Sequence, residues 1–291
     1  MLLEKQNKLT AILWDSVNEP VSFVKDESKW RKPRNRELAE SFLTREKGLS
    51  WLGVKDVPTL LKTLDEGWPE GVAKLEKIAL RDLASPASVR RRRIRSDQGD
   101  EVDMQAVWRG DLSRAWTKTR RQSRTGVRSI TIVIDLAAAW NVDADELFWR
   151  GASALRLAGE LVSAGYNVAI YAAAACSSYT ESDSDNRLAQ LIEIKGEDSP
   201  FDIDRLAALT ALPGFFRTHL FNGICFAADN AGETVCDSMG RPSNKTIAEG
   251  IKLLPIPQNT FIQKDVLSRE AAEQWIESVI QQIEAGNLEA A

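Results

Sequence analysis

Residues 127–175 read VRSITIVIDLAAAWNVDADELFWRGASALRLAGELVSAGYNVAIYAAAA and contain three regular patterns in a row. The first is Ile130–Asp135, a β-branched run whose length is typical of a buried strand. Asp145–Ala164 follows with apolar residues at helical spacing, and Gly165 is placed to end that helix. Tyr166–Ala175 is a second apolar run that suits a buried strand. A strand, a helix and a strand in this order predict a right-handed βαβ unit with parallel strands.

The remainder of the C-terminal part continues this alternation. The further elements that we expect are a strand at Leu188–Ile194, helices at Asp202–Leu212, Phe215–Phe226 and Ser268–Ala285, and a strand within residues 255–262. The sequence therefore predicts the α/β class. The expected core, over residues 129–291, is Rossmann-like, with a mostly parallel sheet flanked by helices.

Residues 1–86 are expected to form a helical extension in front of this core. Pro58 suits the first turn of a helix, and Gly67 is expected to close that helix in a left-handed conformation. A second helix is expected to start at Trp68 and Pro69. Its apolar face is made of Val72, Leu75, Ile78, Ala79 and Leu83.

Residues 87–128 lie between these two parts and are strongly basic. Between residues 88 and 128, twelve Arg or Lys stand against five acids, a local charge of +7 in a chain whose formal net charge is −4. Because guanidinium groups bind phosphates and release counterions, we expect a polyanion such as nucleic acid as the partner. Trp108 and Trp116 lie in the same segment, and only unpaired bases expose the faces on which aromatic rings stack. The combination favours single-stranded DNA over a duplex.

The candidate nucleic-acid-binding residues are the bases and tryptophans of this segment, with a smaller cluster near the N-terminus. They are Arg90, Arg91, Arg92, Arg93, Arg95, Trp108, Arg109, Arg114, Trp116, Lys118, Arg120, Arg121, Arg124, Arg128, Trp30, Arg31, Lys32 and Arg34. The alternative interpretation is that the arginine run is a solvated linker and that Trp108 and Trp116 are ordinary core residues.

The core region is acidic, in contrast to the basic segment that precedes it. Residues 129–291 hold eleven bases and twenty-three acids, a balance of −12. Such a surface repels DNA and suits a basic protein partner, although an acidic surface that only keeps the protein soluble is the commoner explanation of such a balance. The candidate partner-binding acids are Glu181, Asp183, Asp185, Glu273, Glu277 and Glu284.

The chain offers little for catalysis. His219 is the only histidine, and its position among phenylalanines on an expected helix favours a packed structural role. The sequence has no phosphate-binding P-loop, no G-x-G-x-x-G after a strand and no G-x-S-x-G. The three cysteines, Cys176, Cys225 and Cys236, lack the close pairing of a disulfide framework or a zinc site. We therefore expect no catalytic residue, no metal and no cofactor.

One pattern keeps a nuclease as an alternative. Glu193-Ile194-Lys195, preceded by Asp183 and Asp185, is loosely similar to the Asp…Glu-x-Lys site of metal-dependent nucleases. This pattern is common by chance, so an ordinary Glu and Lys at a strand edge are the expected interpretation.

Asp135 ends an expected buried strand. There it resembles the first residue of the Asp-x-Ser-x-Ser metal site of von Willebrand A-type domains. Both serine positions are alanine in this chain, Ala137 and Ala139, so the oxygen ligands that a hard cation needs are absent from them. The resemblance implies an A-type-like scaffold without its metal, in which Asp135 caps the following turn or pairs with an arginine.

The chain also resembles the Drc family of Schitoviridae podoviruses, single-stranded-DNA-binding cofactors of phage RNA polymerase. The resemblance rests on SWLGVKDVPTLLKTLDEGWPEG (residues 50–71), on the tract Gly110–Arg128 and on residues 127–175. It implies a non-enzymatic transcription cofactor that binds melted promoters and recruits the phage polymerase. An A-type-like protein-interaction scaffold is the alternative function, and homo-oligomerisation is left open.

The sequence also bears on location. The N-terminus MLLEKQNKLT breaks its apolar start with charged residues, and no apolar run approaches the roughly 20 residues that a membrane-spanning helix needs. We expect a protein of the host bacterial cytoplasm with no membrane partner.

Overall fold

The structure is a computed structural model. It describes residues 1–44, 48–78, 91–96, 101–111, 115–121, 129–139, 142–176, 186–232, 235, 243–257, 259–263 and 266–285.

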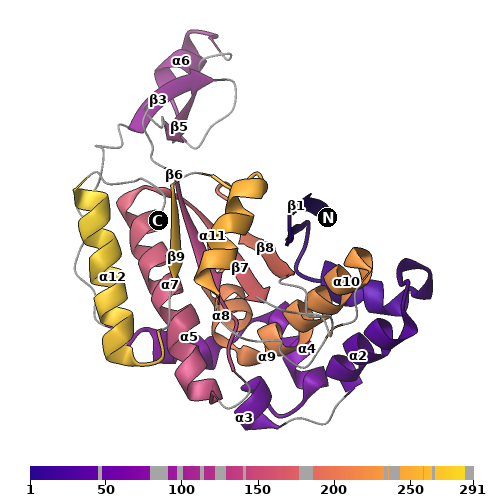
Figure 1. Cartoon of the computed structure of the whole chain (residues 1–291). Coiled ribbons are helices and arrows are strands. Elements are labelled where there is room, and N and C mark those ends of the chain that lie inside the picture. The colour runs from indigo at the N-terminus through magenta and orange to yellow at the C-terminus, as the bar shows by residue number, and fades with distance from the viewer. Residues whose placement is uncertain are drawn as a thin grey trace.

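The body of the molecule is built on a six-stranded sheet (Figure 1). The strands lie in the order β1 (Leu2–Gln6), β2 (Leu9–Trp14), β8 (Arg187–Lys195), β7 (Asn167–Cys176), β6 (Ser129–Asp135) and β9 (Thr260–Gln263). The pairs β2–β8, β7–β6 and β6–β9 are parallel, whereas β1–β2 and β7–β8 are antiparallel. The sheet is mostly parallel and is flanked by helices, which confirms the predicted α/β class.

The predicted βαβ unit is present as β6, α7 (Ala144–Ala164) and β7. α7 begins at a capping box, in which the backbone N–H of Asp143 donates to the carboxylate of Glu146 over 3.2 Å. It ends at Gly165, whose φ of 98° and ψ of 16° lie in the left-handed region. β6 is buried along nearly its whole length, as expected of a strand covered on both faces.

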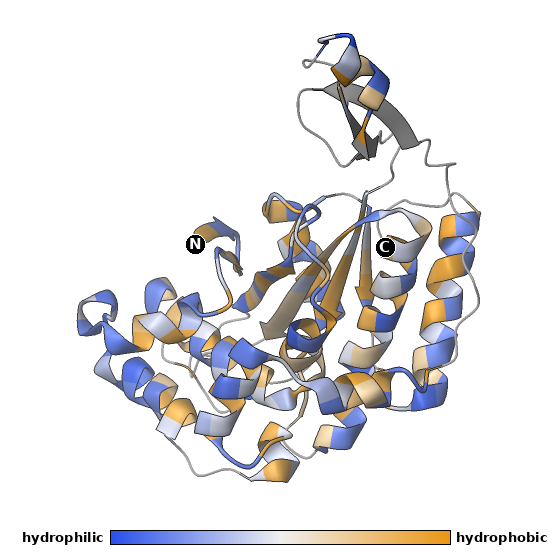
Figure 2. Ribbon diagram, turned by 180° about the vertical axis from the view of Figure 1, so that it is seen from behind, coloured by the Kyte–Doolittle hydropathy of each residue, from blue (hydrophilic) through white to orange (hydrophobic). Residues whose placement is uncertain are grey.

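Helices cover the two faces of the sheet unequally. α7, α8 (Ile203–Ala211) and α12 (Arg269–Glu284) contribute to the larger core, whereas α11 (Asn244–Leu253) packs on β2, β7 and β8. The side chains of β6 alternate accordingly: Ile132 and Ile134 belong to the larger core, and Val133 lies in a smaller core with Ile247 of α11. Figure 2 shows the central strands of the main sheet hydrophobic along most of their length and several of the helices around them hydrophobic on one side.

The other helical segments of the body lie before α7 or between α8 and α11. They are α1 (Glu19–Ser22), η1 (Phe23–Lys25), η2 (Glu27–Lys29), α2 (Pro33–Thr44), α3 (Leu49–Leu52), α4 (Val57–Glu66), α5 (Pro69–Leu75), α9 (Pro213–Phe215), the π-helical turn η4 (Phe216–Leu220) and α10 (Phe221–Ala231). The helices expected near residues 202–212, 215–226 and 268–285 lie where the sequence predicts them. The strand expected within 255–262 is shorter and shifted, at Thr260–Gln263.

The N-terminus differs from the predicted helical extension. β1 and β2 form a hairpin whose turn contains Asn7 at a φ of 53°, and β2 pairs with β8 inside the main sheet. β2 reads LTAILW and is mostly buried, because an apolar strand beside β8 completes the core. The main sheet therefore includes residues from the range 2–14, so the body is not confined to residues 129–291 as the sequence predicts.

The expected helix pair around Trp68 is present with different ends. α4 begins where the carboxylate of Asp56 accepts from the backbone N–H of Thr59 over 2.8 Å. Gly67 has a φ of 98° but a ψ of 172°, so it ends α4 in an extended turn and not in the expected left-handed helical conformation. α5 stops at Leu75, before the full predicted length. Ala79 and Leu83 lie outside the described residues.

A second, smaller sheet stands apart from the body (Figure 1). We call β3 (Arg91–Ser96), β4 (Glu101–Val102) and β5 (Trp116–Arg121), together with α6 (Met104–Trp108), the appended sheet. Its strands lie in the order β3-β5-β4, all antiparallel. The sequence predicts no regular structure here, because arginine-rich strands lack the apolar alternation by which strands are recognised.

Candidate nucleic-acid interface

The appended sheet gathers most of the described basic candidates on two neighbouring strands. Arg91, Arg92, Arg93 and Arg95 are residues of β3, and Lys118, Arg120 and Arg121 are residues of β5. Segments more than twenty residues apart in the sequence are thereby placed side by side. The pairing of β3 with β5 therefore brings most of the described basic positions into one small sheet.

The register of the two strands places like charges opposite each other. Arg91 pairs with Arg121 and Arg92 pairs with Arg120. Like charges at directly opposed positions destabilise a ladder. The register therefore concentrates positive formal charge on the paired positions of β3 and β5.

Trp116 lies within this basic ladder. Alternate residues of a strand share a face, so Trp116 is on the same sheet face as Lys118 and Arg120, and cross-strand pairing adds the position of Arg92. The indole of Trp116 is 37% exposed, and Val102 opposite it is 42% exposed. Trp116 is therefore not a core residue, and an aromatic surface lies beside basic positions.

Trp108 lies on α6, between β4 and β5. The carboxylate of Asp103 caps this helix by accepting from the backbone N–H groups of Gln105 and Ala106. The backbone N–H of Asp103 in turn donates to the carbonyl of Ala115 over 2.7 Å. Trp108 is 80% exposed, so the alternative of an ordinary core tryptophan is wrong for this residue also. Arg109 follows it and is exposed.

The N-terminal candidates lie elsewhere. Trp30 is half-buried: its indole N–H donates to the carbonyl of Phe23 over 2.8 Å, and its ring meets Phe226 edge-on at 5.5 Å. The backbone N–H groups of Arg31 and Lys32 donate to the carboxylate of Asp229 over 2.6 and 2.8 Å. These contacts fix the chain on α10 of the body. α2 and α10, which hold or contact these residues, lie on the body and apart from the appended sheet (Figure 1).

Some predicted residues lie outside the part of the chain that the structure describes. They are Arg90, Arg114, Arg124 and Arg128 among the basic candidates, and Glu181, Asp183 and Asp185 among the acidic ones.

Asp135 has one of the roles expected of it. Its carboxylate accepts from the backbone N–H of Ala137 over 2.9 Å and so caps the turn after β6. The buried guanidinium of Arg150 donates to the carbonyls of Asp135 and Ala137 over 2.8 and 2.6 Å. The positive charge at the end of β6 is therefore the guanidinium of Arg150. Among the described residues, no group of three or more His, Cys, Asp or Glu could hold a metal ion.

The remaining titratable candidates are engaged in the fold. His219 is buried in η4, and burial lowers its pKa to about 3. The carboxylate of Glu193 accepts from the hydroxyl of Tyr171 over 2.8 Å. The ammonium of Lys195 donates to the carbonyls of Val168 and Gly196, each over 2.8 Å, and burial lowers its pKa. These contacts match the interpretation of Glu193 and Lys195 as structural residues.

No helix within the described ranges combines the length and the apolar content needed to cross a bilayer. No curated protein and no solved structure matches the chain. A family model described as "Domain of unknown function (DUF7192)" matches residues 4–286, which is nearly the whole sequence. The chain therefore belongs to the DUF7192 family.

Proposed function

We propose that the protein binds single-stranded nucleic acid through the appended sheet and has no catalytic activity of its own. The observation that carries the proposal is the exposed indole of Trp116 on a sheet face that also holds Arg92, Lys118 and Arg120. Basic residues follow a phosphate backbone, and exposed aromatic rings stack on unpaired bases whatever their sequence. Single-stranded nucleic acid supplies phosphates for the basic residues and unpaired bases for the ring of Trp116.

The wider proposal is that binding serves phage transcription, in which the protein recruits the phage RNA polymerase to melted promoters in the host cytoplasm. The charge division supports two separate contacts. The appended sheet is basic, whereas residues 129–291 carry a balance of −12, which favours a basic protein surface over DNA. DNA and polymerase then bind different regions of one molecule.

The first experiment is a fluorescence-anisotropy titration of the full-length protein with a labelled oligonucleotide, single-stranded or annealed to its complement, at two salt concentrations. We expect tighter binding of the single strand and a steep loss of affinity at the higher salt. Equal affinity for both forms contradicts the role of the aromatic rings. Absence of binding at low salt contradicts the whole proposal.

A protein-interaction scaffold is the second candidate function, and the exposure of Trp108 favours it. Tryptophan is enriched among the residues that dominate protein–protein binding energies. If neither form of DNA binds while a protein partner is bound through α6, the scaffold function holds.

A further inference from the structure

The end of the appended sheet exposes a preformed apolar helix face. Met104 and Trp108 are separated by one helical turn on α6 and are 55% and 80% exposed. The cap at Asp103 and the buried Ala106 and Ala115 hold this turn in place. We call Met104–Arg109 the tip. Contiguous exposed apolar patches, unlike single exposed apolar residues, mark interaction sites.

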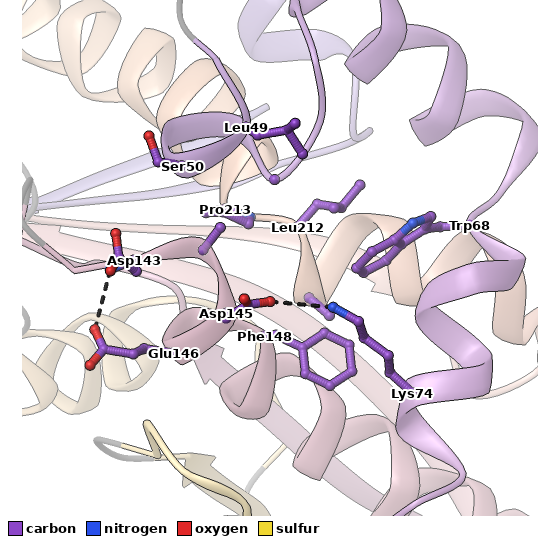
Figure 3. Close-up of a pocket in the computed structure, with 13 residues that line it drawn as sticks. Leu49, Ser50, Trp68, Lys74, Asp143, Asp145, Glu146, Phe148, Leu212 and Pro213 are labelled. Carbon is purple, nitrogen blue, oxygen red and sulfur yellow. Dashed lines mark hydrogen bonds and ion pairs between the residues drawn. The ribbon is translucent and has the colours of Figure 1, made fainter.

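A pocket of about 500 Å³ lies at the opposite end of β6, where α7 begins (Figure 3). Its floor is apolar and buried, made of Phe148, Leu212 and Pro213. The ring of Trp68 forms one wall and meets Phe148 at 82° with 5.9 Å between centroids. Leu49, which is 67% exposed, stands at the lip. The volume is within the range of about 300–1,000 Å³ found for ligand pockets.

The rim of the pocket is acidic. Asp143, Asp145 and Glu146 supply three carboxylates from the start of α7, and Lys74 supplies one ammonium, which pairs with Asp145 over 3.3 Å. The side chain of Asp145 remains 91% exposed. The pocket therefore suits an apolar group that is followed by a positive charge.

The walls of the pocket are held rigidly. The ring of Trp68 lies against Gly71, where an added Cβ would be only 2.1 Å from the indole, so the Trp-Pro-Glu-Gly sequence fixes the ring. The buried guanidinium of Arg217 lies over the ring of Trp51 at 4.1 Å and donates to the carbonyls of Trp51 and Val142 over 2.7 and 2.9 Å. These bonds join α3 to the loop before α7. A rigid pocket loses little entropy when it is filled.

We propose that the tip of one molecule docks into this pocket of a second copy, with Trp108 on the apolar floor and Arg109 at the acidic rim. Tryptophan and arginine are, with tyrosine, enriched among the residues that dominate interface binding energies, and such residues cluster near interface centres in well-packed pockets. The tip supplies them in adjacent positions, and the pocket supplies the aromatic wall and the carboxylates that they need.

The contact is between copies and is directional. β5 ends at Arg121 before β6 begins at Ser129, whereas the pocket lies beyond the end of β6, so the tip and the pocket are at opposite ends of the molecule (Figure 1). Because the two surfaces differ, each molecule can donate its tip to one neighbour and accept the tip of another. The result is a head-to-tail chain. The contact forms without nucleic acid.

The test is sedimentation velocity without nucleic acid, because self-association depends on protein concentration. We expect wild-type protein to form species larger than dimers as concentration rises from micromolar to submillimolar. Trp108→Ala removes the indole that is proposed to fill the pocket, and Asp145→Lys reverses one charge at the rim of the pocket. Each variant alone is therefore expected to stay monomeric. Asp65→Lys makes the same charge change outside the pocket and is expected to assemble as the wild type does.

Mixing the two inactive variants gives the decisive result. Trp108→Ala keeps its pocket and Asp145→Lys keeps its tip, so an equimolar mixture is expected to form heterodimers and nothing larger. A symmetric interface or a misfolded variant does not produce this pattern. A wild type that is monomeric throughout, assembly that survives Trp108→Ala, or a mixture that stays monomeric overturns the proposal. DNA binding by the same proteins is measured separately. Failure of the proposed self-association can therefore be told apart from failure of the proposed DNA binding.

Discussion

Tryptophan and arginine come together in two regions of this molecule and are used differently. In the body, Arg217 lies over Trp51 at 4.1 Å and its guanidinium donates to backbone carbonyls, so the pairing is completed within the chain. In the appended sheet, Trp116 shares a face with Arg92 and Arg120, and 37% of its surface remains exposed. Arg217 and Trp51 therefore stabilise the fold, whereas Trp116 remains partly exposed at the surface. Exposure separates the two roles where composition does not.

The largest expected effect is in the body. Arg217→Met removes the guanidinium and leaves the carbonyls of Trp51 and Val142 without this donor. Each buried carbonyl left unsatisfied costs about 1–3 kcal/mol, so we expect the free energy of unfolding, measured by urea denaturation, to fall by about 2–6 kcal/mol. The control Arg205→Met changes an exposed arginine and is expected to stay within about 0.5 kcal/mol. Equal losses in both variants contradict the role given to Arg217.

Tryptophan substitutions extend the comparison. Trp116→Ala is expected to cost about 1–3 kcal/mol of single-strand affinity and to leave the melting temperature nearly unchanged. Trp14 is fully buried, and Trp14→Ala is expected to lower the stability by about 3–5 kcal/mol without a comparable loss of affinity in the folded protein. Anisotropy and thermal melting measure the two quantities. A large melting shift for Trp116→Ala with binding preserved makes Trp116 a structural residue.

The pH dependence of stability reports on the body. Burial holds the pKa of His219 near 3, below the ordinary value of 6.5. Above pH 6.5 both folded and unfolded states are neutral at this residue, whereas between 6.5 and 3 only the unfolded chain binds the proton. Stability is therefore expected to fall with decreasing pH in this window, by up to about 1.4 kcal/mol per pH unit from this group. His219→Gln should remove that part of the slope in urea titrations at pH 7 and 5; an unchanged slope means that His219 is accessible to protons in the fold.

The smallest effect on DNA binding is expected from the acidic side. Glu273→Lys and Glu277→Lys reverse charges on α12, which lies on the body and not on the appended sheet (Figure 1). Since exposed charges are screened beyond about 10 Å at 0.1 M salt, oligonucleotide affinity should stay equal or become slightly tighter. Association with the phage RNA polymerase in a pull-down should be weakened. Loss of DNA affinity in this variant places part of the DNA site on the body.

The sequence predicted the centre of the fold because its signals are local. Ile130–Asp135 is long enough for a strand and too short for a helix, and Asp145–Ala164 has both helical spacing and a closing glycine. The hairpin of β1 and β2 was missed because β2 is a short apolar run within a polar stretch, and its partner β8 lies about 180 residues later. Pairing over such a distance leaves no pattern in either segment alone.

The candidate interface was predicted in composition but not in shape. Charge counting found the arginines and the two tryptophans, but the pairing of β3 with β5 gives no apolar alternation to detect. Charge and aromatic content did not show that Trp30 lies on the body, where its indole N–H donates to the carbonyl of Phe23. The Trp-Pro-Glu-Gly sequence was a usable signal for the pocket, since a glycine one turn after a tryptophan allows the ring to lie on the helix.

The most direct test of the central claim is the salt dependence of single-strand binding in a matched pair of variants. Arg92→Ala, Lys118→Ala and Arg120→Ala together remove three bases from the face of Trp116, and Lys55→Ala, Lys62→Ala and Lys77→Ala remove three exposed bases from the body. Each phosphate contact on a single strand contributes about −0.7 to the slope of log K against log salt, so about six contacts give about −4. The first variant should flatten that slope by about 2, and the second should leave it unchanged. Equal slopes in both variants would contradict the assignment of single-strand binding to the appended sheet.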